Sequence, residues 1–169
     1  SKLAMEDVKD ICEVHDDTMR NTYMRFKQDK EHETTILLDA HADEVGFIVQ
    51  AIKPNGTIRF LPLGGWDPKN IVSGEVWILN DKGEKISGIV ASQPVHFLSE
   101  EKRNGKVDFD DLVIDVGATS AQEVKEEFHI SVGNFMCPAV TCKYDEAHKI
   151  FLGKAFDCRI GCAAVMDVL

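Results

Sequence analysis

The 169-residue sequence predicts an α/β fold that is interrupted by an inserted β-rich module. Three observations along the chain support this prediction. Helix-like and strand-like patterns occupy residues 1–44, short strand-like runs separated by turn signals fill residues 45–140, and a strand pattern followed by an apolar helix pattern returns in residues 141–169. A module inserted into a split parent domain is the simplest explanation, and its short strands favour a small barrel or sandwich.

The part before the module contains one expected helix and two expected strands. Residues 5–19 place apolar side chains at approximately helical intervals, which predicts a short amphipathic helix. Residues 22–27 are strand-like, and residues 34–38 form the β-branched and apolar run that is typical of a buried strand. The polar residues 28–33 predict the turn between these strands.

Five short strands are expected inside the module. Turn signals bound them, such as the Pro-Asn-Gly that ends at Gly56 and the Asp-Lys-Gly that ends at Gly83. Ser120 and Glu123 have the spacing of a capping box and predict a brief helix over residues 121–127. The expected strands cover residues 46–52, 57–61, 75–79, 85–90 and 112–116.

After the module, the pattern predicts a strand over residues 150–152, a loop over 153–157 and an apolar helix over 160–169. No Gly, Asn or Pro stop signal follows this helix, so we expect it to belong to a longer chain. Its apolar face should then be exposed in the 169-residue chain, which predicts poor monomer solubility or self-association.

Composition excludes several classes of protein. An apolar content of 44% is ample for a core, and a formal net charge of -10 argues against a nucleic-acid partner. The apolar runs are too short to span a bilayer, so no membrane association is expected. Five irregularly placed cysteines do not suggest a disulfide framework, which indicates a reducing, cytoplasmic location.

A candidate metal ligand follows the expected strand over residues 34–38. Strand ends in open α/β sheets are where sites form, and His41 and Asp43 stand there. A neutral imidazole is a strong zinc ligand, and a carboxylate two residues away can orient the ring. A polar loop after a strand is also common, and the spacing alone favours that simpler interpretation.

A second candidate, Asp157, stands at the start of the expected last helix. Its two carboxylate oxygens could bridge two cations. The alternative is a helix N-cap that pairs with Arg159, and the local sequence taken alone favours this alternative.

The cysteines offer a rival metal site. Four thiolates, from Cys137 with Cys142 and from Cys158 with Cys162, could hold a structural zinc ion. The spacings are looser than a C-x2-C knuckle, so buried free thiols are the favoured interpretation. His96 is interpreted as structural.

Taken together, the segments around His41 and Asp157 resemble the family of tetrahedral, glutamyl and lysyl aminopeptidases, some of whose members were once labelled cellulases. Residues 41–47 match its His-x-Asp-Glu-Val/Ile-Gly-Phe motif, and residues 155–162 match its Ala-Phe-Asp-Asp-Arg-Val-Gly-Cys motif. The resemblance runs from about residue 21 to residue 169. It includes, in order, residues 63–68, 88–90, 94–96 and 111–118.

The resemblance implies a zinc-peptidase-like catalytic α/β domain, with a sheet sandwiched by helices, that is interrupted by a barrel-like module for oligomerisation. The family's assembled particle is a hollow tetrahedral dodecamer. The implied site holds two divalent metal ions, with His41 binding one, Asp157 bridging both and Asp43 orienting His41. Zinc is the expected metal, and cobalt or manganese are alternatives.

Two departures from the family pattern follow. Cys158 stands where the family usually has a second acidic residue, which puts any role for that position in doubt. The family's general-base Glu, its neighbouring Glu ligand, a further Asp and a final His all correspond to positions after residue 169.

The implied reaction is the removal of N-terminal residues from short peptides by a metal-activated water. We expect the 169-residue chain alone to be inactive and to bind zinc weakly, because those ligands and that base are missing. One alternative is a non-catalytic oligomerisation module. Another is a glycoside hydrolase (endoglucanase), which would need two carboxylates flanking a sugar bond and no metal pair.

Overall fold

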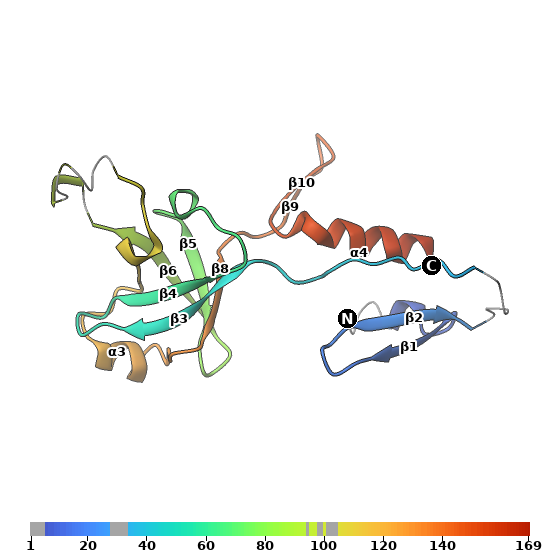
Figure 1. Ribbon diagram of the computed structural model, residues 1–169, viewed down its shortest axis with the longest axis horizontal. Coiled ribbons are helices and arrows are strands. Elements are labelled where there is room, and N and C mark those ends of the chain that lie inside the picture. Colours follow the sequence, from blue (N-terminus) through green and yellow to red (C-terminus); the bar gives the residue numbers. More distant parts are fainter. Residues whose placement is uncertain (1–5, 28–33, 94, 98–99, 101–104) are drawn as a thin grey trace. The chain divides into compact units, whose positions relative to one another are not determined.

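The computed structural model describes residues 6–27, 34–93, 95–97, 100 and 105–169 (Figure 1). Contacts divide the chain into two compact units. One, the barrel unit, is Glu44–Lys154, and the other, the helix unit, combines Ser1–Asp43 with Ala155–Leu169. The barrel unit is therefore continuous in sequence, whereas the helix unit is assembled from the two ends of the chain. The catalytic role expected for residues 1–44 and 141–169, and the oligomerisation role expected for residues 45–140, stay predictions.

Six antiparallel strands of the barrel unit close into a barrel in the order β3-β4-β7-β6-β5-β8. Closure pairs the backbone groups that open sheet edges would leave free, and it confirms the expected β-rich module. The five predicted strands are all present, with ends that differ by at most two residues. The strands are β3 (Gly46–Ile52), β4 (Ile58–Leu63), β5 (Glu75–Leu79), β6 (Lys85–Ser92), β7 (Leu112–Asp115) and β8 (Phe135–Pro138).

Apolar side chains fill the barrel interior. The Phe47 ring on β3 is fully buried, with its centroid 5.2 Å from that of Phe60 and 4.7 Å from that of Trp66. The Trp66 indole N–H donates to the Gly46 carbonyl at 3.1 Å, so this large ring is both packed and hydrogen-bonded. Burial of each such side chain is worth about 1.5–3 kcal/mol. The same core includes Ile58, Ile78, Val90, Leu112, Ile114, Val124 and Ile130.

A buried asparagine shapes the turn between β5 and β6. Within the described ranges, Asn80 is the sole polar residue classed as buried. Its amide donates to the Phe128 carbonyl and to Glu84, each at 2.9 Å, and its oxygen accepts from the backbone N–H groups of Lys82 and Glu84. These bonds offset the cost of burying the amide and hold the predicted Asp-Lys-Gly turn.

The predicted helix after β7 is present as α3 (Ala121–Glu126). The Ser120 side chain caps it by accepting from the Glu123 N–H at 3.2 Å. The second half of the expected capping box differs, because the Glu123 carboxylate accepts from the backbone and hydroxyl of Thr119 instead. Short 3-10 turns at Pro68–Asn70, Val95–Phe97 and Phe109–Asp111 complete the connections that the structure describes.

Two strands of the barrel unit are not predicted from the sequence. β8 contains Cys137 and ends in Pro138, so it lacks the β-branched alternation of an obvious strand, yet it pairs with both β3 and β5. β9 (Lys143–Asp145) forms a hairpin with the predicted β10 (Ile150–Leu152). Tertiary pairing, rather than local propensity, determines both.

The amphipathic helix expected over residues 5–19 is wrong for most of its length. Residues 6–8 are helical, but β1 (Cys12–Asp16) and β2 (Thr22–Phe26, as expected) form an antiparallel hairpin. The reason is the turn, where one Asp17 oxygen accepts from the N–H groups of Met19 and Asn21 at 2.9 Å. The predicted turn over residues 28–33 lies outside the described residues.

The buried strand expected over residues 34–38 is also wrong in this structure. These residues have no regular secondary structure, and the side chains of Ile36 and Leu37 are 82% and 81% exposed. A strand is stable only when its backbone groups find a partner, and none of the described strands pairs with this segment.

The last predicted helix is confirmed and starts earlier than expected, as α4 (Phe156–Val168). Asp157 and Cys158 depart from helical backbone angles, the peptide between them is cis, and Ala155 has a φ of 60°. The apolar side chains of Ile160 and Val168 are 63% and 66% exposed, as expected for an uncovered helix face. Among the described residues, no helix is long and apolar enough to span a bilayer.

Candidate metal centre

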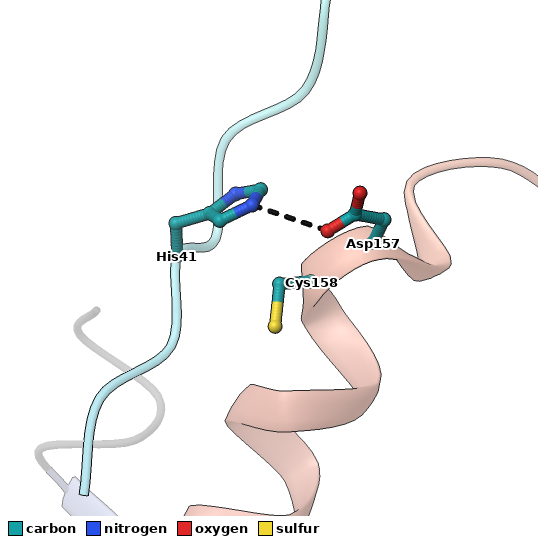
Figure 2. A group of neighbouring side chains, drawn as sticks. All are labelled: His41, Asp157 and Cys158. Atoms are coloured by element: carbon teal, nitrogen blue, oxygen red, sulfur yellow. Dashed lines mark ion pairs between the residues drawn. The ribbon is translucent and has the colours of Figure 1, made fainter.

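The two candidate ligands come together within the helix unit. His41 lies on the irregular segment that follows residues 34–38, and Asp157 lies at the start of α4. The His41 Nε2 atom is 3.3 Å from a carboxylate oxygen of Asp157, and Figure 2 shows the ring turned toward that carboxylate. His41 precedes the barrel unit in the sequence and Asp157 follows it, yet the two residues share one site.

Asp43 contacts the other nitrogen of the same ring. Its carboxylate oxygen is 3.1 Å from His41 Nδ1. A neutral imidazole has one N–H, so it can donate to only one of the two carboxylates. A divalent cation between His41 Nε2 and Asp157 would use both of these atoms as ligands, while the Nδ1 side of the ring faces Asp43.

Two hydrogen bonds join the His41 segment to α4. The Arg159 Nε–H donates to the Ala42 carbonyl at 2.9 Å, and the Cys162 thiol donates to the His41 carbonyl at 3.3 Å. Each bond connects residues more than 100 positions apart in sequence. They hold the backbone that carries His41 against the helix that carries Asp157, and the sequence contains no local signal for either contact. The sequence suggests Arg159 as a partner of Asp157, and the structure adds its hydrogen bond to the Ala42 carbonyl.

A glycine permits the close approach of these two segments. A Cβ atom at Gly161 would lie 2.5 Å from the Cys158 sulfur and 3.1 Å from the Ala40 Cβ atom. Contacts below 3.0 Å are essentially never seen for real Cβ atoms, so a larger residue would displace one of these neighbours. The glycine in this part of the sequence therefore has a steric role at the site.

Cys158 is the third potential ligand in the group. Its sulfur, a ring nitrogen of His41 and a carboxylate oxygen of Asp157 all lie within 4.8 Å of one another (Figure 2). In the described part of the chain, no other three His, Cys, Asp or Glu side chains meet in this way. From the sequence, a role for position 158 is in doubt because the family usually has an acidic residue there, whereas in the structure the Cys158 sulfur lies beside the donor atoms of His41 and Asp157.

The donor set fits a divalent cation. Two ligands at about 2.1 Å from a tetrahedral zinc ion lie roughly 3.4 Å apart, which agrees with the 3.3 Å between His41 Nε2 and the Asp157 oxygen. The His41 and Asp157 side chains are 57% and 96% exposed. This exposure leaves several coordination positions open to water or to further protein ligands.

The rival four-cysteine zinc site is not formed among the described residues, because the group of potential ligands there contains a single cysteine. All five cysteines are free, as expected, but only Cys12 is buried: Cys142 is exposed, and Cys137, Cys158 and Cys162 are partly buried. His96 is exposed, lies on a 3-10 turn of the barrel unit and is not a member of the metal group.

Comparison with known proteins places the whole arrangement in a family. Residues 21–169 match the family described as M42 glutamyl aminopeptidase. The chain is 39% identical over 129 residues to the putative aminopeptidase FrvX of Escherichia coli K12, covering 76% of this chain and 36% of that protein. It is 34% identical over 141 residues to the glutamyl aminopeptidase of Lactococcus lactis, covering 82% of this chain and 39% of that protein.

Solved structures agree with this match. A TET aminopeptidase from Thaumarchaeota archaeon SCGC AB-539-E09 superimposes with a TM-score of 0.86 at 34% identity, over 98% of this chain and 46% of that one. A Thermotoga maritima structure titled endoglucanase has a TM-score of 0.75 at 27% identity, over 99% of this chain and 47% of that one. The Pyrococcus horikoshii TET1 peptidase has a TM-score of 0.77 at 26% identity, over 98% of this chain and 48% of that one. That peptidase can assemble into a tetrahedron or a large octahedral shell. The chain thus spans less than half the length of these relatives.

Proposed function

The chain belongs to the M42 glutamyl aminopeptidase family, and from this premise we propose that it forms part of a metal-dependent aminopeptidase that removes N-terminal residues from peptides. The observation that carries the proposal is the 3.3 Å approach of His41 Nε2 to the Asp157 carboxylate. A pair of bound divalent cations would lower the pKa of a water molecule and polarise the scissile carbonyl. The expected metal is zinc, with cobalt or manganese as alternatives.

Each of the three predicted residues has a distinct role in this proposal. His41 binds one cation through Nε2, because Nδ1 faces Asp43 at 3.1 Å. Asp43 holds the proton on Nδ1 and orients the ring, which keeps the Nε2 lone pair available for a cation. Asp157 has a second oxygen that is free to bind another cation, so it is suited to bridge the pair.

We propose that the ligands described within residues 1–169 form only part of a catalytic site. A catalytic zinc site ordinarily has three protein ligands and an open position, and the group here provides His41, Asp157 and at most Cys158. The relatives are more than twice as long as the matched region. We therefore propose that residues outside 1–169 supply the other ligands and the general base, and that this chain by itself does not hydrolyse peptides.

Self-association through the barrel unit is the second part of the proposal. The Pyrococcus horikoshii relative can assemble into a tetrahedron or a large octahedral shell, and a dodecameric tetrahedron is the assembly expected here. The barrel carries exposed apolar side chains on its outer surface, including Leu61, Leu79, Ile89 and Phe135. Such side chains are suited to an interface between copies.

The endoglucanase title of the Thermotoga maritima structure keeps a glycoside hydrolase as the alternative. Two carboxylates would then have to face a sugar bond from opposite sides. In this structure Asp43 and Asp157 both face the His41 ring, and this arrangement suits a cation better than a glycosidic bond.

Zinc binding tests the proposal directly. We expect isothermal titration of the 169-residue chain to show zinc binding that is abolished in His41→Ala and strongly reduced in Asp157→Asn. His96→Ala, which removes an exposed histidine outside the group, serves as the control and should bind zinc as the unchanged chain does. Equal zinc binding by all three variants would contradict the proposed site. Release of amino acids from peptides by the purified 169-residue chain, with contaminating peptidase excluded, would contradict its proposed incompleteness.

A further inference from the structure

The strongest unassigned feature is the thiol beside the two proposed ligands. We propose that Cys158 is a third ligand, and that its thiolate gives this centre a mixed nitrogen, oxygen and sulfur donor set that prefers thiophilic divalent cations such as Zn²⁺ and Cd²⁺. This inference rests on the proposed function, since it needs a cation at His41 and Asp157. It goes further because nothing in the expected His and carboxylate set includes sulfur.

The geometry brings the three donors within reach of one cation. They lie within 4.8 Å of one another, and a tetrahedral ion with nitrogen and sulfur ligands requires a separation of roughly 3.6 Å. The difference is therefore at most about 1 Å. A cysteine side chain has a single rotatable bond before the sulfur, so rotation about Cα–Cβ of Cys158 is the side-chain motion that changes this separation.

The local backbone supports the same assignment. Asp157 and Cys158 are adjacent residues with non-helical backbone angles, and their donor atoms lie within 4.8 Å of each other. The Cys158 side chain is partly buried, whereas Asp157 is almost fully exposed. Water therefore has less access to the Cys158 side chain than to the Asp157 carboxylate.

Gly161 provides the space that the sulfur occupies. A Cβ atom there would lie 2.5 Å from the Cys158 sulfur. The absence of a side chain at position 161 is thus a condition for the present position of the thiol.

The chemistry needs no reactant beyond the cation and the solvent. Binding replaces the S–H bond of Cys158 by a sulfur–metal bond, and the proton leaves to the buffer. Sulfur is a soft donor, so Zn²⁺ and Cd²⁺ gain more from this ligand than Mn²⁺, which prefers carboxylate and water. Cys158 stands where the family usually has an acidic residue, and this difference thereby determines which metal the site prefers.

Titration of the 169-residue chain with Co²⁺ in oxygen-free buffer tests the inference. Thiolate ligation produces a sulfur-to-metal charge-transfer absorption in the near ultraviolet, and this signal reports the bond itself rather than activity. We expect the absorption in the unchanged chain and its loss in Cys158→Ser. Cys162→Ser is the matched control, because it removes the neighbouring thiol but keeps a hydroxyl that can donate to the His41 carbonyl; it should retain the absorption.

Two further variants separate the bond from the mere presence of a thiol. Gly161→Ala leaves Cys158 in the chain but displaces its sulfur, so the absorption should weaken while the helical circular dichroism is kept. In competition experiments, Cys158→Ser should weaken Cd²⁺ binding by at least about tenfold, the scale seen when a ligand loses its support, and should leave Mn²⁺ binding nearly unchanged.

The possible failures are distinguishable. Co²⁺ binding that depends on His41 but shows no charge transfer would overturn the thiolate ligand and leave the proposed function intact. A charge-transfer signal that is lost in Cys162→Ser and kept in Cys158→Ser would show that Cys162 supplies the thiolate. That result would also overturn the inference. No His41-dependent binding of Co²⁺, Zn²⁺ or Cd²⁺ would overturn both this inference and the proposed metal site.

Discussion

Glu44 and Lys154, the first and last residues of the barrel unit, form an ion pair with 3.1 Å between the carboxylate oxygen and the ammonium nitrogen. Their side chains are only 22% and 20% exposed, and the Lys154 ammonium also lies 5.7 Å from the centre of the Trp77 ring. The pair therefore joins the two ends of the barrel unit at the points where the chain enters and leaves it. Partial burial makes the interaction stronger than an ordinary surface ion pair.

Replacement of Lys154 by Met should destabilise the barrel unit by about 1–2 kcal/mol, because it leaves the Glu44 carboxylate partly buried without this partner. Urea unfolding followed by tryptophan fluorescence measures this, since Trp66 and Trp77 both lie in the barrel unit. Lys149→Met is the matched control, as Lys149 pairs with Glu146 in a far more exposed position and its loss should cost less than about 0.5 kcal/mol. Equal losses of unfolding free energy in the two variants would show that partial burial of the Glu44–Lys154 pair does not increase its contribution to stability.

Asp43→Asn should weaken zinc binding by about 10–100-fold while leaving His41 in place, because the amide can no longer hold the proton on Nδ1 as a carboxylate does. Competition with a chromophoric chelator measures the affinity. Asp39→Asn, which changes an exposed carboxylate two residues on the other side of His41, is the control for loss of negative charge and should change the affinity less than about threefold. If both variants weaken binding equally, Asp43 acts through charge alone and does not orient the ring.

Gly56→Ala should cost more stability than Gly83→Ala, although both glycines have positive φ, 84° and 77°. The left-handed backbone costs either alanine about 1 kcal/mol. A Cβ atom at Gly56 would also lie 2.3 Å from the Ala118 carbonyl oxygen, whereas one at Gly83 would meet nothing within 4 Å. We expect the Gly56 variant to lose about 1–3 kcal/mol more in urea unfolding, since a backbone clash cannot be relieved by side-chain rotation.

Stability on the acid side should depend on Asp81. Hydrogen bonds from the Ser131 hydroxyl at 2.5 Å and the Asn134 amide at 2.9 Å hold the pKa of the Asp81 carboxyl below its ordinary value of 3.8. A depressed folded-state pKa contributes stability that is present above the unfolded value and is lost as pH falls through the folded one. The urea midpoint of the unchanged chain should therefore fall between about pH 5 and about pH 3 more steeply than that of Asp81→Asn.

Ser131→Ala tests the cause of this pH dependence, because it removes the hydroxyl donor and keeps the carboxylate. It should also flatten the fall in the urea midpoint. Asp167→Asn, on α4 in the helix unit, should leave the slope of the barrel transition unchanged. A slope that is the same in Asp81→Asn and in the unchanged chain would mean that these hydrogen bonds do not couple to folding.

The sequence by itself determined five of the six barrel strands and identified His41 and Asp157 as candidate ligands. β3 and β5 were predicted to the residue, because strands bounded by turn residues such as Gly56 and Gly83 carry their own local signals of alternation and chain reversal. His41 and Asp157 were identifiable through the motifs around them, although each taken singly favoured a simpler interpretation.

Only the tertiary structure decided which of these segments pair and which residues meet. The β1–β2 hairpin replaced an expected helix, and residues 34–38 remain without a strand partner among the described residues, because pairing depends on segments distant in sequence. The approach of Cys158 to His41 and Asp157 has the same origin. Contacts such as that between Cys162 and His41 join positions 121 residues apart, and no local pattern can carry that information.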